Sequence, residues 1–149
     1  MPAANHPPIL VADDDAQDTL LLRLAVERAK VAVAVRSVTD GEQAIDYLLG
    51  RKGYEDRQAH PFPRFLLLDL KMPKMNGFEV LDFLRRQPGL RQLPVIILSS
   101  SDDPRDIRRA YDSGANSYLC KPHSSEGLGE LLKALQDYWL KFNHFPPCE

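Results

Sequence analysis

The sequence predicts an α/β fold in which helices cover both faces of a doubly wound, five-stranded parallel sheet. Short apolar segments alternate along the chain with segments of helical periodicity, and most of the apolar segments are continuous. Polar residues follow these segments directly. A continuous apolar segment is typical of a strand that is buried on both sides, and its alternation with helices indicates parallel strands joined by right-handed crossovers.

Each predicted strand is a short segment of apolar or β-branched residues. In chain order the strands span 9–12, 31–38, 65–68, 95–98 and 117–120. The first, third and fourth are continuous runs of Ile, Leu, Val, Phe and Ala, as in the inner strands of a covered sheet. The second is rich in Val, and the fifth is brief and runs directly into Lys121.

Each predicted helix has apolar residues three and four positions apart. In chain order the helices span 18–30, 42–49, 78–86, 103–111 and 124–142. Asp18 is a start signal for the first helix. Asp103 and Pro104 start the fourth, because Asp suits the cap and Pro suits the first turn. Pro88-Gly89 closes the third.

Length and composition indicate one domain. A chain of 149 residues with 44% apolar content can build one core but is short for two domains of ordinary size. We place the domain at 9–141, after a lead-in at 1–8 and before a C-terminal arm at 142–149. Within it, 51–63 holds Gly, Pro, His and charge without a period, which predicts an exposed, inserted loop. A tolerated surface insertion is the favoured interpretation of this loop, and a partner-binding feature is the alternative.

Charge, cysteine content and hydropathy argue against several classes of partner. A formal net charge of -2 gives no general attraction to nucleic acid. The two cysteines, Cys120 and Cys148, cannot form a disulfide framework or a zinc site, which fits a reducing, cytoplasmic location. We expect Cys120 to be a buried filler residue. No apolar run approaches the roughly 20 residues needed to cross a bilayer, so we expect no membrane partner.

Polar side chains follow four of the predicted strands, at the edge of the sheet where ligands of such folds bind. They are Asp13, Asp14, Asp69, Ser99 and Lys121. Carboxylates this close repel one another unless a cation intervenes. Ligands that are all oxygen favour Mg²⁺, Ca²⁺ or Mn²⁺, and Mg²⁺ takes one or two carboxylates together with phosphate oxygens. Mg²⁺ is therefore the predicted ion.

Asp69 is the predicted nucleophile, because we expect its strand to lie between the first and the fourth. A carboxylate can attack a phosphoryl group and form an aspartyl-phosphate. Such a transfer needs mainly positioning and neutralisation of the phosphoryl oxygens, which a metal, a lysine and a small hydroxyl can supply. Asp13 and Asp14 would then serve as the metal acids.

Taken together, these residues resemble the receiver domain of two-component response regulators. The resemblance rests on Asp13-Asp14, on the stretch 69–77 (DLKMPKMNG), on Ser99 after the fourth strand and on Lys121-Pro122, and it covers about 9–141. It implies the flavodoxin-like (βα)₅ receiver fold. It also implies that a sensor histidine kinase phosphorylates Asp69.

The resemblance further implies a role for each residue of the site. Mg²⁺ would be held by Asp14, Asp69 and the backbone carbonyl of Lys71, with Asp13 acting through water. Ser99 and Lys121 would contact the phosphoryl oxygens.

Other residues would govern the switch and its lifetime. The Lys121-Pro122 bond would be cis, which only an X-Pro bond adopts cheaply. Tyr118 stands at the position of the family's switch aromatic and would turn inward as Ser99 moves toward the phosphate. Three residues near the attack path would tune the phosphate's lifetime, namely Lys71, Ser100 and Ser101.

The inserted loop and the aromatic C-terminus are also similar to the small regulators of bacterial phytochrome kinases. This similarity rests on Tyr138-Trp139 and on Phe145 with the two prolines after it. It implies a phytochrome-type kinase as a partner and a homodimer formed partly through the last helix and the arm. We expect the signal to leave by association with a downstream protein, through a population shift.

Two other functions compete with this interpretation. A phosphatase of the haloacid-dehalogenase type also uses a strand-end Asp with Mg²⁺, but it needs a second acid two residues after the nucleophile, where this chain has Lys71. A receiver that has lost its chemistry is the other alternative, and the complete acidic set argues against it.

Overall fold

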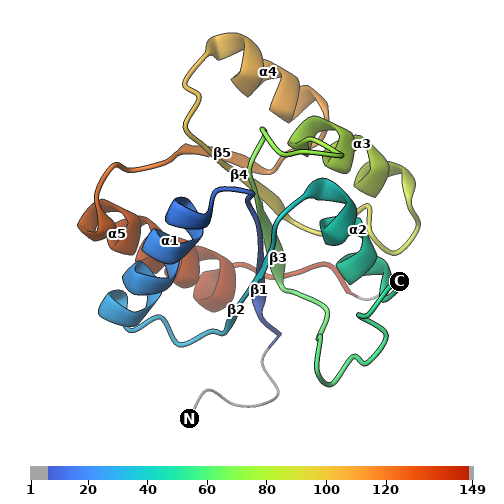
Figure 1. The fold of residues 1–149 in the computed structure, drawn as a ribbon, viewed down its shortest axis with the longest axis horizontal. Helices are drawn as coiled ribbons and strands as arrows, with labels where there is room; N and C mark the ends of the chain where they lie inside the picture. The colour runs from blue at the N-terminus through green and yellow to red at the C-terminus, as the bar shows by residue number, and fades with distance from the viewer. Residues whose placement is uncertain (1–6, 148–149) are drawn as a thin grey trace.

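The computed structural model describes residues 7–147, and these form a five-stranded parallel sheet with helices on both faces (Figure 1). The strands are β1 (Ile9–Ala12), β2 (Val35–Val38), β3 (Phe65–Leu68), β4 (Val95–Ser99) and β5 (Ser117–Cys120). The helices are α1 (Ala16–Ala29), α2 (Gly41–Leu49), α3 (Gly77–Arg86), α4 (Pro104–Asp112) and α5 (Ser125–Leu135), and the π-helix η1 (Gln136–Phe142) follows. The predicted fold class is confirmed.

The order of the strands places β3 in the middle of the sheet. The order is β2-β1-β3-β4-β5, with all neighbours parallel. Ala12 of β1 pairs with Leu68 of β3, so the residues that follow these two leave the sheet side by side. The expectation that the strand before Asp69 lies between the first and the fourth is confirmed.

Two hydrophobic clusters cover the two faces of the sheet. Alternate residues of the inner strands point to opposite faces: Leu10, Leu66 and Ile97 belong to one cluster, and Ile9, Phe65 and Ile96 to the other. The first cluster is completed by α2 and α3, and the second by α1 and α5, which lie on opposite sides of the sheet in Figure 1. This double burial is why the inner strands are continuously apolar.

Several element boundaries differ from the prediction. Helix α1 begins at Ala16, because the Asp15 side chain accepts hydrogen bonds from the backbone amides of Gln17 and Asp18 and so caps the helix two residues before the predicted start. Strand β2 begins only at Val35, the residue that pairs with Ile9 at the start of β1. Residues 31–34 precede that register and have no strand partner on β1.

The last predicted helix is divided in two. Regular α-helix ends at Leu135, and the backbone continues in the wider π-helical form through Phe142. Trp139 of this segment packs near Phe65 and Phe145, with ring centroids 6.0 and 6.4 Å apart. Part of the predicted aromatic stripe is therefore covered by the chain itself, while Tyr138 is exposed. The spacing of apolar residues continues across both segments and could not mark their boundary.

The loop between α2 and β3 forms no helix or strand, as predicted, but it is tied to the end of α2. The Arg57 guanidinium donates hydrogen bonds to the carbonyl oxygens of Tyr47, Leu48 and His60 at 2.7, 2.8 and 3.1 Å. The Tyr47 hydroxyl donates to the Pro61 carbonyl at 2.8 Å. Whether the loop binds a partner stays a prediction.

Within the described residues, no helix has the length and apolar character to cross a membrane.

Cys120 is exposed, so the expectation that it is buried was wrong. The reason is its place in the fold, because it is the last residue of an edge strand. Cys148 lies outside the described residues, as do parts of the predicted lead-in and arm.

Candidate functional site

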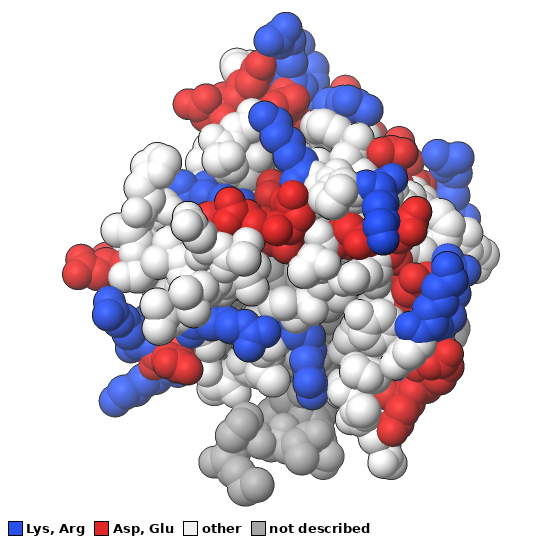
Figure 2. All heavy atoms as spheres, viewed as in Figure 1, with Lys and Arg blue, Asp and Glu red and all other residues white. Residues whose placement is uncertain are grey.

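Three carboxylates lie together where β1 and β3 end. Asp13 and Asp14 follow β1, Asp69 follows β3, and one oxygen of each lies within 4.8 Å of the others. Asp13 and Asp69 are buried, while Asp14 is exposed. In Figure 2, acidic side chains gather above the carboxyl ends of the strands, with basic side chains beside them. The structure thus brings the three predicted acids to one place.

Lys121 directs its ammonium into this group of acids. Its Nζ atom lies 2.9 Å from an oxygen of Asp13 and 3.2 Å from an oxygen of Asp69. The residue follows β5, and its backbone amide donates to the Ser99 carbonyl at 2.8 Å, which fixes the chain that carries the side chain. Its side chain is only 13% exposed, so the ion pairs are shielded from water. The predicted lysine is therefore in contact with the predicted nucleophile.

Asp18 is a site residue that sequence reasoning missed. Its carboxylate accepts a hydrogen bond from Lys121 Nζ at 2.7 Å, the shortest of the three contacts of this ammonium. We interpreted it only as a helix start signal. The sequence offered part of the signal, because an acid in the first turn of the helix after β1 lies near the end of that strand, but it does not show which way the side chain points.

Hydrogen bonds to neighbouring backbone groups fix the position of Asp69. Its amide donates to the Ala12 carbonyl at 3.0 Å, and its Oδ1 atom accepts from the Leu70 amide at 2.8 Å. Gly77 opens α3 and donates its amide to the Leu70 carbonyl at 2.9 Å. A Cβ atom at Gly77 would overlap the Asp69 carbonyl oxygen, so only glycine permits this approach. The reason for glycine at the end of the 69–77 stretch is thus steric.

Burial and neighbouring charges shift the pKa values of Asp69 and Lys121. Burial, with the nearby Asp13 charge, raises the pKa of Asp69 from its ordinary 3.8 to about 6, although Lys121 opposes the rise. Burial lowers the pKa of Lys121, but its contacts with Asp18 and Asp13 outweigh this and leave it raised. A simple ion pair would instead lower the pKa of the acid. The pKa of Asp69 nevertheless rises, because burial and the Asp13 charge together outweigh the attraction of Lys121.

This imbalance of charge fits a divalent cation. The oxygens of Asp13, Asp14 and Asp69 are grouped closely enough for one ion, and they are the hard ligands that Mg²⁺ and Ca²⁺ prefer. A cation there would favour the ionised form of Asp69 and so oppose the rise in its pKa that burial and the Asp13 charge cause.

Ser99 and Tyr118 are linked through Ser101. Ser99 is buried at the end of β4, and its hydroxyl oxygen accepts from the Ser101 amide at 3.1 Å. The Tyr118 hydroxyl donates to the Ser101 carbonyl at 2.8 Å. The Ser101 hydroxyl in turn donates to Asp106 of α4 at 2.7 Å. The predicted switch residues therefore belong to one hydrogen-bonded chain, with Ser101 in the middle.

The other predicted tuning residues lie at the surface. Lys71 and Ser100 are both exposed. Lys71 and Asp14 border the same groove, of about 520 Å³, beside the acids. Residues on α3 and α4 complete the groove, and there the guanidinium of Arg109 lies 4.0 Å from the ring centre of Phe78. Lys71 is thus placed at the entrance to the site.

The prediction of a cis bond at Lys121-Pro122 was wrong. No peptide bond is cis in the part of the chain that the structure describes. The trans form is the lower-energy state of an X-Pro bond, and Lys121 reaches its three carboxylates with the bond in this form.

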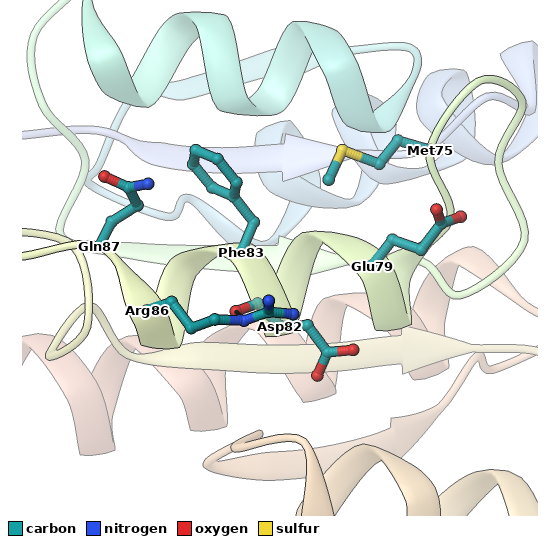
Figure 3. Close-up of a pocket in the computed structure, with 6 residues that line it drawn as sticks. All are labelled: Met75, Glu79, Asp82, Phe83, Arg86 and Gln87. Atoms are coloured by element: carbon teal, nitrogen blue, oxygen red, sulfur yellow. Dashed lines mark hydrogen bonds between the residues drawn. The ribbon is translucent and has the colours of Figure 1, made fainter.

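A second hollow, of about 330 Å³, lies along α3 and contains none of the predicted site residues. Figure 3 shows Phe83 and Met75 pointing toward the neighbouring helix, whereas Asp82 and Arg86 extend along the other side of α3. Its polar lining has mixed charge, with Glu79 and Asp82 beside Arg86. This hollow therefore shares no residue with the group of acids at the strand ends.

Comparison with known proteins agrees with this geometry. The model of the response regulator receiver domain matches residues 9–135. The probable methanogenesis regulatory protein FilR2 of Methanothrix harundinacea is 39% identical over 138 residues, which are 93% of this chain and 86% of the relative.

Solved structures of response regulators superpose on almost the whole chain. Response regulator RPA3017, in red light signaling of R. palustris, has a TM-score of 0.89 at 38% identity and covers 95% of this chain and 99% of its own. The phosphorylated cyanobacterial phytochrome response regulator RcpA has a TM-score of 0.84 at 32% identity, with the same coverage. Since the family model spans most of the sequence, the chain belongs to the response regulator receiver family of two-component signalling.

Proposed function

We propose that Asp69 accepts a phosphoryl group from a sensor histidine kinase and that the change is passed on by association with another protein. One observation carries the proposal. Asp69 lies in the centre of the sheet's carboxyl edge, in contact with Lys121 and grouped with Asp13 and Asp14. A nucleophile, a cation and metal-type ligands are the components that phosphoryl transfer requires.

In the transfer, an Asp69 carboxylate oxygen attacks the phosphorus of a phosphohistidine. The bond between phosphorus and the imidazole nitrogen breaks, and the nitrogen keeps the electron pair and takes up a proton. Lys121 and the Ser99 hydroxyl would bind the phosphoryl oxygens. Asp69 must be ionised to attack, and its raised pKa of about 6 leaves it mostly ionised at pH 7.

We propose Mg²⁺ as the cofactor. Asp14, Asp69 and the backbone carbonyl of Lys71 would hold it, and Asp13 would act through water. When bound, the ion supplies positive charge that offsets the negative charge of the phosphoryl oxygens. The close grouping of the three carboxylates supports this assignment.

The switch would run through the hydrogen-bonded chain from Ser99 to Tyr118. If Ser99 moves toward the phosphoryl group, it changes the position of Ser101, whose carbonyl holds the Tyr118 hydroxyl. The proposed effect is a shift of population toward a state in which Tyr118 and the last strand and helices are rearranged. Lys71, Ser100 and Ser101 would set how long that state lasts.

For the partners, we propose a phytochrome-type kinase in the cytoplasm and a homodimer through the last helix and arm. The description of RcpA as a phytochrome response regulator and of RPA3017 in red light signaling supports the kinase. The exposed Tyr138 and Phe142, at 56% and 68%, support an interface. Sedimentation of the Tyr138→Glu and Phe142→Glu variants tests the dimer, since unchanged sedimentation would contradict it.

A phosphatase of the haloacid-dehalogenase type is not supported. The position two residues after Asp69 is Lys71, which is exposed and is not an acid. A signalling domain is expected to show no sustained turnover of small phosphoesters, and sustained turnover would contradict the proposal.

The direct test is labelling with acetyl phosphate and Mg²⁺. The wild type should gain one acid-labile phosphoryl group, and Asp69→Asn should gain none. Normal labelling of Asp69→Asn would refute the assignment of the acceptor. Phosphotransfer from a panel of kinases, phytochrome-type kinases included, then identifies the donor as the one that transfers fastest.

A further inference from the structure

The contacts of Lys121 divide into two kinds. Its ammonium has three hydrogens and meets three carboxylates, those of Asp13, Asp18 and Asp69. Asp13 and Asp69 belong to the group of acids that can hold a metal ion, together with Asp14. Asp18 does not belong to that group, although it makes the shortest contact with the ammonium.

A divalent cation and the Lys121 ammonium compete for the same carboxylates. The Oδ2 atoms of Asp13 and Asp69 both accept from Lys121. A doubly charged ion held by Asp69 and, through water, by Asp13 would repel the ammonium, because the two like charges would lie within a few ångströms of each other. When the ion binds, the Lys121 ammonium therefore needs a negatively charged partner other than these two acids.

Asp18 offers that charge at the edge of the site. Its side chain is 38% exposed, against 9% and 11% for Asp13 and Asp69. An ammonium that keeps its bond to Asp18 is on the side of the site that reaches water, where its charge costs least.

We propose that Asp18 is a positioning residue that holds the Lys121 ammonium when a divalent cation binds Asp69 and, through water, Asp13. The inference rests on the proposed metal site. Asp18 keeps the ammonium close enough to meet an incoming phosphoryl group, and it lowers the competition between ammonium and metal for the shared carboxylates.

A purely local role is the alternative. An acid in the first turn of a helix stabilises it through the helix dipole. Helix α1 already has its cap in Asp15, whose side chain accepts from two backbone amides. Asp15 also provides a matched control, because among the described residues Lys121 pairs with three carboxylates and Asp15 is not one of them. Asp15→Asn removes one negative charge near the site and keeps a good N-cap.

The experiment is calorimetric titration with Mg²⁺ of the full chain, without any phosphodonor. The proteins are the wild type, Asp18→Asn, Lys121→Gln, the double variant and Asp15→Asn. Asp18→Asn should weaken Mg²⁺ binding about fivefold, since the freed ammonium turns to the metal acids. Lys121→Gln should strengthen it, and in that background Asp18→Asn should change the affinity less than twofold. Asp15→Asn should stay within about twofold of the wild type.

The outcomes separate the roles. An equal loss from Asp18→Asn in both backgrounds would overturn the inference, because Asp18 would then act on the ion by its charge alone. An affinity unchanged in Asp18→Asn would overturn it as well, with the metal site intact. A wild type that binds no Mg²⁺ would overturn the proposed metal site and the inference together. Near-ultraviolet circular dichroism of Trp139 confirms that each variant is folded.

Discussion

The Ser101 hydroxyl donates a 2.7 Å hydrogen bond to the Asp106 carboxylate and so fastens the end of β4 to the first turn of α4. The carbonyl of the same residue accepts from Tyr118 on β5. Ser101 therefore joins three elements next to the proposed phosphorylation site. Its neighbour Ser100 is exposed.

This arrangement predicts that Ser101→Ala and Ser100→Ala differ in stability. Loss of the half-buried bond to a charged acceptor should lower the free energy of unfolding by about 1.5 kcal/mol in Ser101→Ala. Ser100→Ala should stay within about 0.5 kcal/mol of the wild type. Urea unfolding measures both, and equal effects would contradict a structural role for the Ser101 hydroxyl.

The raised pKa of Asp69 predicts an unusual dependence of stability on pH in metal-free protein. The folded state holds the proton more tightly than the unfolded state, with a pKa of about 6 against the ordinary 3.8. Ionised Asp69 therefore destabilises the folded state above pH 6, and this cost disappears as the pH falls toward 4. Asp69→Asn removes the cost.

The measurement is urea unfolding in EDTA at several pH values. Asp69→Asn should be more stable than the wild type at pH 7.5 by on the order of 1–2 kcal/mol, and the difference should shrink between pH 6 and pH 4. A difference that grows as the pH falls would mean that the pKa of Asp69 is lowered, and that Lys121 outweighs burial.

Binding of Mg²⁺ should reverse this destabilisation. An ion that binds only the folded state raises the free energy of unfolding by about 2.7 kcal/mol at a concentration 100 times its Kd. Asp14→Asn should lose most of this gain. Asp14 is exposed, so the substitution itself should alter metal-free stability little. Thermal unfolding with and without Mg²⁺ tests it, and an equal rise in Tm for both proteins would exclude Asp14 as a ligand.

The fold and most of the site could be predicted because each depends on a local pattern. Continuous apolar runs such as Phe65–Leu68 identify strands buried on both faces. Since parallel strands end at one edge, their following residues converge, and Asp13, Asp69 and Lys121 do so. Family resemblance added the expected roles.

The features that could not be predicted depend on three-dimensional packing: where a side chain points, where a strand lies in the sheet and which type of helix forms. The sequence marks Asp18 as an acid near a helix start, but only the packing of α1 beside β5's end directs it at Lys121. Burial of Cys120 was expected from its strand, but the edge position of β5 exposes it. The change from α-helix to π-helix after Leu135 leaves the apolar spacing almost unchanged.

Gly77 should tolerate no side chain. A Cβ atom there would overlap the Asp69 carbonyl oxygen and lie 2.9 Å from the Leu70 Cα, both of which are backbone atoms that cannot turn aside. Gly77→Ala should therefore lower the free energy of unfolding by about 2–3 kcal/mol. At Gly129 in α5 a Cβ would meet only ordinary contacts of 3.7 and 3.8 Å. Gly129→Ala should be neutral or stabilising by up to about 1 kcal/mol, and urea unfolding should give the two variants opposite signs.

The anchoring of the inserted loop by Arg57 predicts that its planar guanidinium is required. The group reaches three backbone carbonyls at once, which the single ammonium of a lysine on its flexible stem cannot match in geometry. Arg57→Lys should lower the free energy of unfolding by about 2 kcal/mol and expose the loop to proteolysis. Arg51→Lys is the matched control, because the Arg51 side chain is 53% exposed and its one ion pair among the described residues is with Asp46, so the substitution should cost less than about 1 kcal/mol. If the loop of Arg57→Lys resists a protease as well as the wild-type loop does, its anchoring must come from the aromatic contacts of Tyr47, Tyr54 and His60 instead.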